Sequence, residues 1–143
     1  MHVSWKSWCW LSWRIRINLK HSTHVSLYRF INKCYKAIDI IKQHADSIAV
    51  IVGAPDINPV REGKDLFNAA FFLYEKEVKA VAHKTCLPNY DVFDEYRYFE
   101  PAYDWNIIEF KGKKLAITIC EDIWNLGDNP LYRNCPMDEL MKF

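Results

Sequence analysis

The stretch "FNAAFFLYEKEVKAVAHK" (67–84) decides the fold, because it holds two apolar runs on either side of a short charged segment. Apolar runs of this length fit strands. The charged residues Glu75 to Glu77 lie between them, where a turn exposes them to water. The stretch therefore predicts a β-hairpin. The preceding run "SIAVIVGAP" (47–55), which ends in Gly-Ala-Pro, predicts a buried strand.

The segments around this hairpin predict a helix and a second hairpin. Apolar residues recur at three- and four-residue spacing from Phe30 to about Ala45, which indicates one apolar face of a helix. The stretch "NIIEFKGKKLAITIC" (106–120) predicts a hairpin with its turn at Lys111 to Lys113.

The C-terminal stretch "NPLYRNCPMDELMKF" (129–143) carries the signals of a helix start. Asn129 is a typical helix cap, and Pro130 suits the first helical position. Pro136 disfavours a helix that runs through it, so the helical part is expected to begin near Met137. The order helix, strand, hairpin, hairpin, helix indicates a layered α/β fold.

The composition excludes several classes of protein. The formal net charge of the 143 residues is +1, which favours neither a nucleic-acid binder nor a protein of the membrane surface. No apolar run approaches the length of a transmembrane helix. The five cysteines are odd in number and have no zinc-binding spacing, which favours a cytoplasmic protein with reduced thiols and no metal site.

The first 28 residues differ from the rest of the chain. Residues 1–28 are basic, free of acidic residues and rich in tryptophan, and they fit neither a helical stripe nor an alternating strand. A misread frame or wrong gene start, a targeting segment and a genuine structural element are the three alternatives. We expect this segment to lie outside the fold.

Cys120 is the first candidate for chemistry, because it ends an apolar run in "ITICEDIW" (117–124). Buried cysteines are common and usually inert, so a structural thiol is the plain alternative. A cysteine at a strand end can instead present its thiol outside the sheet. The backbone N–H groups of Glu121 and Asp122 could then hold an oxyanion.

Two further segments offer polar groups. Lys84 ends an apolar strand, where it could stabilise a thiolate or an oxyanion; a solvated surface lysine is the alternative. His83 is a rival base, but adjacent strand residues point to opposite faces, so only one of the two faces the site. The run "YDVFDEYRYFEP" (90–101) fits either a surface loop with salt bridges or a pocket wall that contains Glu95 or Asp94.

Two of these motifs together resemble a known family. "HKTCLPNYDVFDEYRYF" and "GKKLAITICEDIW" are similar to the amide-hydrolysing (glutaminase) domain of glutamine-dependent NAD+ synthetases, in the nitrilase (carbon–nitrogen hydrolase) superfamily. The strands "VIVGAPD" and "LFNAAFFLYEKEV" fit the same domain. The resemblance runs from about Phe30 to the last residue and covers about half of the usual domain. It implies that residues 29–143 form a partial four-layer α-β-β-α sandwich.

The resemblance implies a Glu–Lys–Cys site in which a cysteine attacks the glutamine amide and releases ammonia. Cys120 would be the nucleophile, Lys84 the oxyanion stabiliser and Glu95 a second glutamate that lines the site. Tyr90, Glu121 and Trp124 would bind the substrate. The base glutamate of the family lies in a Pro-Glu-Leu stretch, and this sequence contains none.

The resemblance also implies partners. A synthetase domain, normally on the same chain, would use ATP, Mg²⁺ and the ammonia to convert deamido-NAD+ to NAD+, and the intact protein would be a homo-oligomer. The glutaminase domain itself needs no cofactor. Two other interpretations stay open: a stand-alone nitrilase-type amidase for another small amide, and a non-catalytic remnant, which the missing base favours. If the chain is instead part of a glutaminase domain, as the resemblance implies, it is expected to be an inactive, poorly stable fragment.

Overall fold

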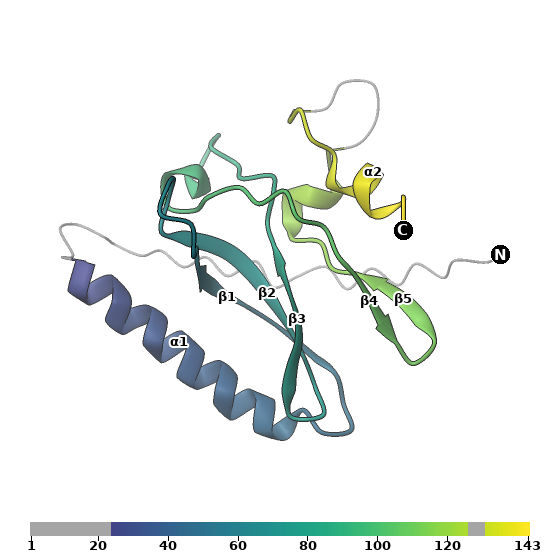
Figure 1. Cartoon of the computed structure of the whole chain (residues 1–143). Coiled ribbons are helices and arrows are strands. Elements are labelled where there is room, and N and C mark those ends of the chain that lie inside the picture. The colour runs from purple at the N-terminus through teal and green to yellow at the C-terminus, as the bar shows by residue number, and fades with distance from the viewer. Residues whose placement is uncertain (1–23, 126–130) are drawn as a thin grey trace.

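The computed structural model describes residues 24–125 and 131–143, in which helices and strands form a mixed α/β arrangement (Figure 1). The elements, in chain order, are α1 (His24–His44), β1 (Val50–Ile57), β2 (Leu66–Tyr74), β3 (Glu77–His83), the 3-10 turn η1 (Glu95–Arg97), β4 (Ile107–Phe110), β5 (Lys113–Ala116), the 3-10 turn η2 (Cys120–Ile123) and α2 (Pro136–Leu140).

Three antiparallel strands form the main sheet, in the order β1-β2-β3. Ala69 of the central strand β2 pairs with Ala54 of β1 on one side and with His83 of β3 on the other. Most residues of β2 are buried, whereas residues of β1 alternate in exposure along much of the strand. Because β2 is buried on both faces, its sequence is a nearly continuous apolar run.

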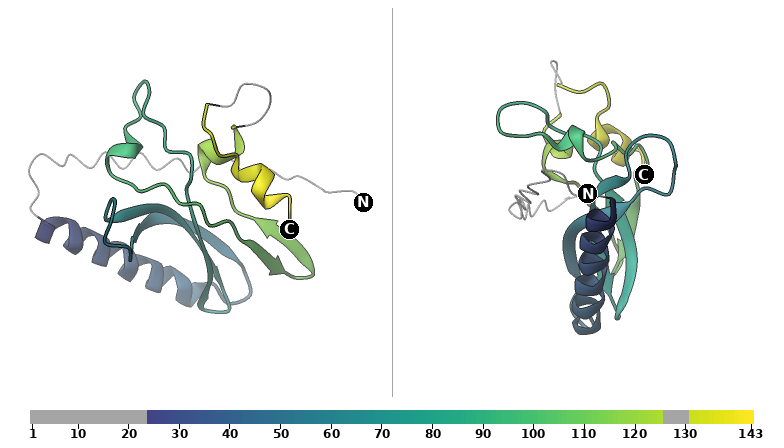
Figure 2. Two further views of the ribbon diagram at one scale, coloured as in Figure 1. Left: turned by 45° about the horizontal axis from the view of Figure 1, so that its top comes forward. Right: turned by 90° about the vertical axis from the view of Figure 1, so that its left-hand side faces the viewer.

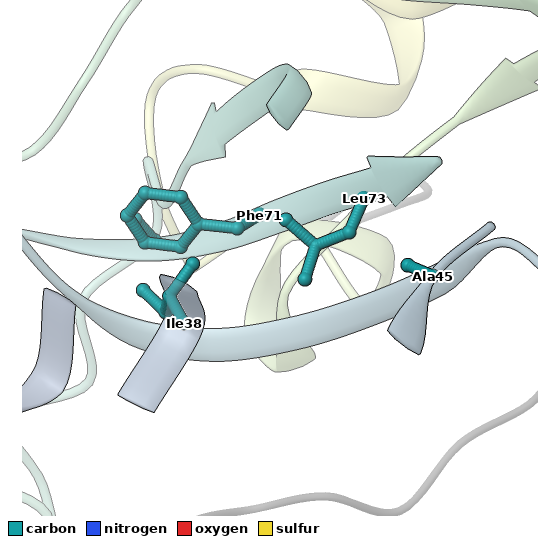
Figure 3. Packing of buried hydrophobic residues seen from close by; sticks show 5 residues of the cluster. Ile38, Ala45, Phe71 and Leu73 are labelled. Atoms are coloured by element: carbon teal, nitrogen blue, oxygen red, sulfur yellow. The ribbon is translucent and has the colours of Figure 1, made fainter. Parts of the chain in front are cut away.

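Helix α1 covers one face of this sheet. Ile38 and Ala45 pack against Ala69, Phe71 and Leu73, which project from alternate positions of β2 (Figure 3). Full burial of a side chain such as Phe71 or Leu73 contributes about 1.5–3 kcal/mol to the free energy of unfolding, relative to leaving it exposed. The periodic apolar face of the helix and the period-2 face of the strand therefore meet in one core.

The second face of the sheet packs against the antiparallel hairpin β4–β5. The ring of Phe110 meets the rings of Phe72 and Tyr74 edge-on, with centroids 5.3 and 4.9 Å apart. The hairpin thus lies on the side of the sheet away from α1 (Figure 2). It covers this face only in part, since Ile51 of β1 is 51% exposed.

The main sheet agrees with the sequence predictions, and so does the turn between β4 and β5, where Lys111 and Gly112 have positive φ. Two predicted boundaries are wrong. Helix α1 begins earlier, at His24, within the segment expected to lie outside the fold. The strand predicted to reach Cys120 ends at Ala116. Helix α2 begins at Pro136, in agreement with the predicted start near Met137, since proline is tolerated where no intrahelical N–H is needed.

Some predictions fall outside this description. The proposed cap Asn129 and its neighbour Pro130 lie outside the described residues, as do residues 1–23. Within residues 24–125 and 131–143, no helix combines the length and hydropathy required to span a bilayer.

A polar network ties α1 to the sheet. The hydroxyl of Tyr35 on α1 donates to Oδ1 of Asp56 on β1 over 2.6 Å. The other oxygen of Asp56 lies 2.8 Å from Nε2 of His83 on β3. Burial alone would raise the pKa of Asp56, but the bonds from His83 and Tyr35 outweigh it and lower the pKa. The stabilisation by this carboxylate is therefore present above the unfolded-state pKa, and it is lost as the pH falls through the folded-state value.

We expect Asp56→Asn to lower the free energy of unfolding by about 1–3 kcal/mol, because it leaves partners of a half-buried carboxylate poorly paired. Urea unfolding of the whole chain at neutral pH measures this loss. The exposed Asp65→Asn is the control, with a change of at most about 0.5 kcal/mol. Equal midpoints for the two variants would show that the network does not hold α1 to the sheet.

Candidate active site

The candidate site is built around the turn η2, which follows an extended backbone at Ile119. Cys120 opens the turn with φ of +50°, a left-handed conformation that is costly for a residue with a Cβ. The side chain of Cys120 is exposed, so the alternative of a buried structural thiol is wrong. The N–H of Asp122 donates to the carbonyl of Ile119 over 3.2 Å, whereas the N–H of Glu121 acts on the thiol and lowers its pKa.

Lys84 lies directly after β3 and is almost fully buried, with 1% exposure. Its backbone N–H donates to the carbonyl of Asn68 over 2.8 Å, and its carbonyl accepts from Ala102 over 3.0 Å. Its ammonium lies 2.8 Å from Oε2 of Glu95. Lys84 is therefore a buried, ion-paired lysine, and the alternative of a solvated surface lysine is wrong.

The neighbouring His83 points to the opposite side of the sheet, as strand geometry predicts. Its ring stacks on Phe67, with centroids 4.5 Å apart, and pairs with Asp56 in the network that holds α1. Of these two neighbours, the residue that shares the site with Glu95 is Lys84.

Glu95 and Asp94, the alternative acids, have different surroundings. Glu95 opens η1 and accepts from both Lys84 and the amide of Asn68, the latter over 3.1 Å. Asp94 is exposed and pairs with Arg97 over 3.2 Å. The loop thus combines a surface salt bridge with one carboxylate that faces the interior, and that carboxylate is Glu95.

The charges of Lys84 and Glu95 both act on the thiol of Cys120. The loss of hydration raises its pKa above the usual value, and the carboxylates of Glu121 and Glu95 raise it further. Lys84 and the N–H of Glu121 lower it. Because the net shift is upward, the thiol stays protonated at neutral pH and needs a proton acceptor to become a nucleophile.

The three predicted substrate-binding residues differ in their contacts. The hydroxyl of Tyr90 donates to the carboxylate of Glu121, and this bond is the main reason why the pKa of Tyr90 rises to about 12. The other oxygen of Glu121 lies 4.0 Å from the sulfur of Cys120. Tyr90, Glu121 and Cys120 therefore form one group. Trp124 directly follows η2 and is 68% exposed.

Sequence reasoning missed Asn68, and it named Asp122 only for its backbone N–H and not for its side chain. Asn68 is the residue of β2 that binds Glu95 through its side chain and Lys84 through its carbonyl. Asp122 is 4% exposed and binds backbone N–H groups of two segments. A buried acid two residues after a candidate nucleophile was a usable signal for Asp122. Asn68 carried no such signal within its apolar run.

Neither metal ligation nor a disulfide occurs in the described part of the chain. The described cysteines, Cys34, Cys86, Cys120 and Cys135, are free thiols. Among the residues for which the structure gives positions, no cluster of His, Cys, Asp and Glu side chains could hold a metal ion.

Comparisons with known proteins find the same kind of enzyme by sequence and by structure. The chain is 43% identical over 95 residues to the glutamine-dependent NAD(+) synthetase of Aquifex aeolicus, a match that covers 66% of this chain and 16% of that protein. The corresponding protein of Synechocystis is 44% identical over 82 residues, with coverage of 55% and 15%. No family model matches the chain.

A solved structure extends the similarity to the fold. The glutamine-dependent NAD+ synthetase of Acinetobacter baumannii, in complex with ADP, aligns with a TM-score of 0.57 and 32% identity, over 66% of this chain and 17% of that one. The chain thus spans about one sixth of the length of the relatives that it matches. Over most of its described residues, this chain is homologous to one segment of the glutamine-dependent NAD+ synthetases.

Proposed function

We propose that this chain carries part of the glutamine-hydrolysing site of a glutamine-dependent NAD+ synthetase. The observation that carries the proposal is the buried Lys84–Glu95 pair, whose charges act on the exposed thiol of Cys120. A lysine with 1% exposure is uncommon in a structural role, and it gives a fixed positive charge beside a nucleophile. The relatives are glutamine-dependent enzymes, which supports glutamine as the amide substrate.

In the proposed reaction, the sulfur of Cys120 attacks the side-chain amide carbon of glutamine. The C–S bond forms as the carbonyl π electrons move to oxygen. The S–H bond breaks as the sulfur attacks, and its proton passes through a proton acceptor to the amide nitrogen. When the tetrahedral intermediate collapses, the C–N bond breaks and the protonated nitrogen leaves as ammonia. Water then attacks the thioester, which releases glutamate and regenerates the thiol.

Lys84 and the N–H of Glu121 are the groups that would stabilise the oxyanion. Both lower the pKa of Cys120, which means that both favour negative charge at the reacting position. Fixed donors of this kind cost no reorganisation as charge develops. Glu95 would hold the ammonium of Lys84 in place, since it lies 2.8 Å away.

The site has a poorly placed proton acceptor for the thiol of Cys120. Within the described residues, Cys120 pairs with Glu121 at 4.0 Å, the outer limit for a sulfur hydrogen bond, and the second oxygen of Glu121 is bound by Tyr90. A positioned acid or base contributes about 10²–10⁴-fold in rate. We therefore propose that the chain alone does not hydrolyse glutamine at an enzyme-like rate.

The remaining assignments follow from the same relationship. Tyr90, Glu121 and Trp124 would surround the glutamine, and the polar Tyr90–Glu121 pair supports this because it lies beside the thiol. The open second face of the sheet, with Ile51 51% exposed, supports a larger layered assembly such as the four-layer sandwich. A synthetase domain that uses ATP, Mg²⁺ and deamido-NAD+, a homo-oligomer and a cytoplasmic location belong to this proposal for the intact protein.

A non-catalytic remnant is the second candidate. The raised pKa of Cys120 and the absence of a Pro-Glu-Leu stretch from the sequence favour it for the chain as written. A stand-alone amidase for another small amide has less support, because the relatives are glutamine-dependent NAD+ synthetases.

Incubation of the whole chain with glutamine should release no ammonia at an enzyme-like rate, because the thiol is protonated and none of the described residues is placed to act as its base. Coupled detection of ammonia measures this, with Cys120→Ala as the matched control. A rate well above that of the control would contradict the inactive-fragment proposal. Labelling of Cys120 by a glutamine-like electrophile, suppressed by glutamine, would distinguish a formed substrate site from a remnant.

Charge substitutions should change the reactivity of Cys120 in opposite directions. Lys84→Met is expected to slow alkylation of Cys120 by iodoacetamide about tenfold near neutral pH, since a rise of one pKa unit cuts the thiolate fraction tenfold. Glu95→Gln should speed it by about threefold, because a negative charge is removed. Peptide mass spectrometry follows alkylation of Cys120 separately from the other cysteines.

The control for these rates is Lys76→Met, in the exposed turn between β2 and β3. This variant removes a lysine charge and should leave the rate unchanged. Equal rates in Lys84→Met and Lys76→Met would mean that Lys84 does not act on the thiol.

A further inference from the structure

Asp122 joins the segment that carries Cys120 to the segment that follows Lys84. We propose that Asp122 is a positioning residue, which fixes the thiol of Cys120 relative to the ammonium of Lys84. The inference rests on the proposed function, in which these two groups act together on one substrate.

The carboxylate of Asp122 binds both segments at once. Its Oδ1 accepts from the N–H of Thr85 over 3.1 Å and from the N–H of Cys86 over 2.7 Å. Its Oδ2 accepts from the N–H of Ile119 over 3.3 Å. Thr85 directly follows Lys84, and Ile119 directly precedes Cys120, so one side chain bridges the two reactive residues through their neighbours.

The segment on the Lys84 side is already firmly held. The hydroxyl of Thr85 donates to the carbonyl of Ala102 over 2.7 Å and accepts from the indole N–H of Trp105 over 3.1 Å. Lys84 itself is bound to Asn68 and Ala102 through its backbone. This segment can therefore serve as the fixed frame to which the cysteine turn is attached.

The segment on the Cys120 side needs such an attachment. The strand β5 ends at Ala116, so residues 117–119 belong to neither a helix nor a strand. Cys120 then adopts a φ of +50°, a conformation that persists only where the surrounding structure imposes it. The carboxylate and the N–H of Asp122 both bind Ile119, which closes the turn from both directions.

A carboxylate suits this position better than a neutral side chain. Asp122 is 4% exposed, and burial raises its pKa above the usual value, although the bonds from the N–H groups of Cys86, Ile119 and Thr85 limit the rise. Both carboxylate oxygens accept hydrogen bonds, whereas the side chain of asparagine presents one oxygen and one NH₂ donor. Asp122→Asn would therefore lose the bond to one of the two segments and loosen the link between them.

A double-mutant cycle tests the proposal, with iodoacetamide alkylation of Cys120 as the readout. In the otherwise unchanged chain, Lys84→Met should slow alkylation about tenfold. In the Asp122→Asn background, the same substitution should slow it less than about twofold, because the ammonium no longer has a fixed position beside the thiol. Asp65→Asn is the control background and should keep the full effect of Lys84→Met.

The direction in which Asp122→Asn changes the alkylation rate of Cys120 distinguishes a positioning role of Asp122 from a direct effect of its charge. Loss of a negative charge at position 122 would by itself lower the pKa of Cys120 and speed alkylation. Loss of the contact with Lys84 would raise the pKa and slow it. The proposal predicts slower alkylation in Asp122→Asn and also in Asp122→Glu, which keeps the charge but misplaces it.

Two outcomes would overturn the proposal. One is an equal effect of Lys84→Met in the unchanged and the Asp122→Asn backgrounds. The other is loss of the folded state in both Asp122 variants, seen as loss of the circular dichroism signal of the unchanged chain, since Asp122 would then support the fold as a whole. Because iodoacetamide replaces glutamine as the probe, failure to hydrolyse glutamine does not affect this result.

Discussion

The buried ammonium of Lys84 is the constraint on which the site depends. A charge with 1% exposure requires an opposite charge and hydrogen-bond acceptors close by, because water cannot solvate it. Glu95 supplies the charge, and Asn68 holds Glu95 in turn. The loop from β3 to η1 must therefore fold back over the end of the sheet. The position of this loop is set by electrostatics as much as by apolar packing.

The strand β2 carries both residues of the hydrophobic core and Asn68, which holds the partner of the buried ammonium. Its adjacent residues Phe71 and Phe72 point to opposite faces and pack against α1 and the β4–β5 hairpin, respectively, so the strand is held from both faces. Asn68 lies three residues before Phe71 on the same strand and is carried with it. The packing that stabilises the sheet thus also positions the groups around Lys84. Loss of core packing should disturb the site even where no site residue changes.

The sequence predicted the elements whose pattern is local and missed the interactions that depend on tertiary structure. The hairpin at 67–84 is read directly from two apolar runs and a charged turn. The end of the next hairpin could not be predicted in the same way, because the β-branched residues 117–119 (Ile-Thr-Ile) continue the pattern of a strand although their backbone has left the sheet. Cys120, Lys84 and Glu95 could be chosen by motif. Asn68 could not, because it stands within an apolar run. Asp122 follows the motif cysteine closely, but the role of its side chain arises from backbone groups that come near it only in the folded chain.

The order of the main sheet has a consequence for the behaviour of the chain in solution. Strand β1 lies at an edge of the sheet and carries the exposed side chains Ile51 and Ile57. An edge strand with exposed apolar residues is a template for intermolecular pairing, and natural proteins usually protect such edges with charges, bulges or a covering element. Self-association through β1, and capture of the newly made chain by chaperones, would then compete with folding at cellular concentrations.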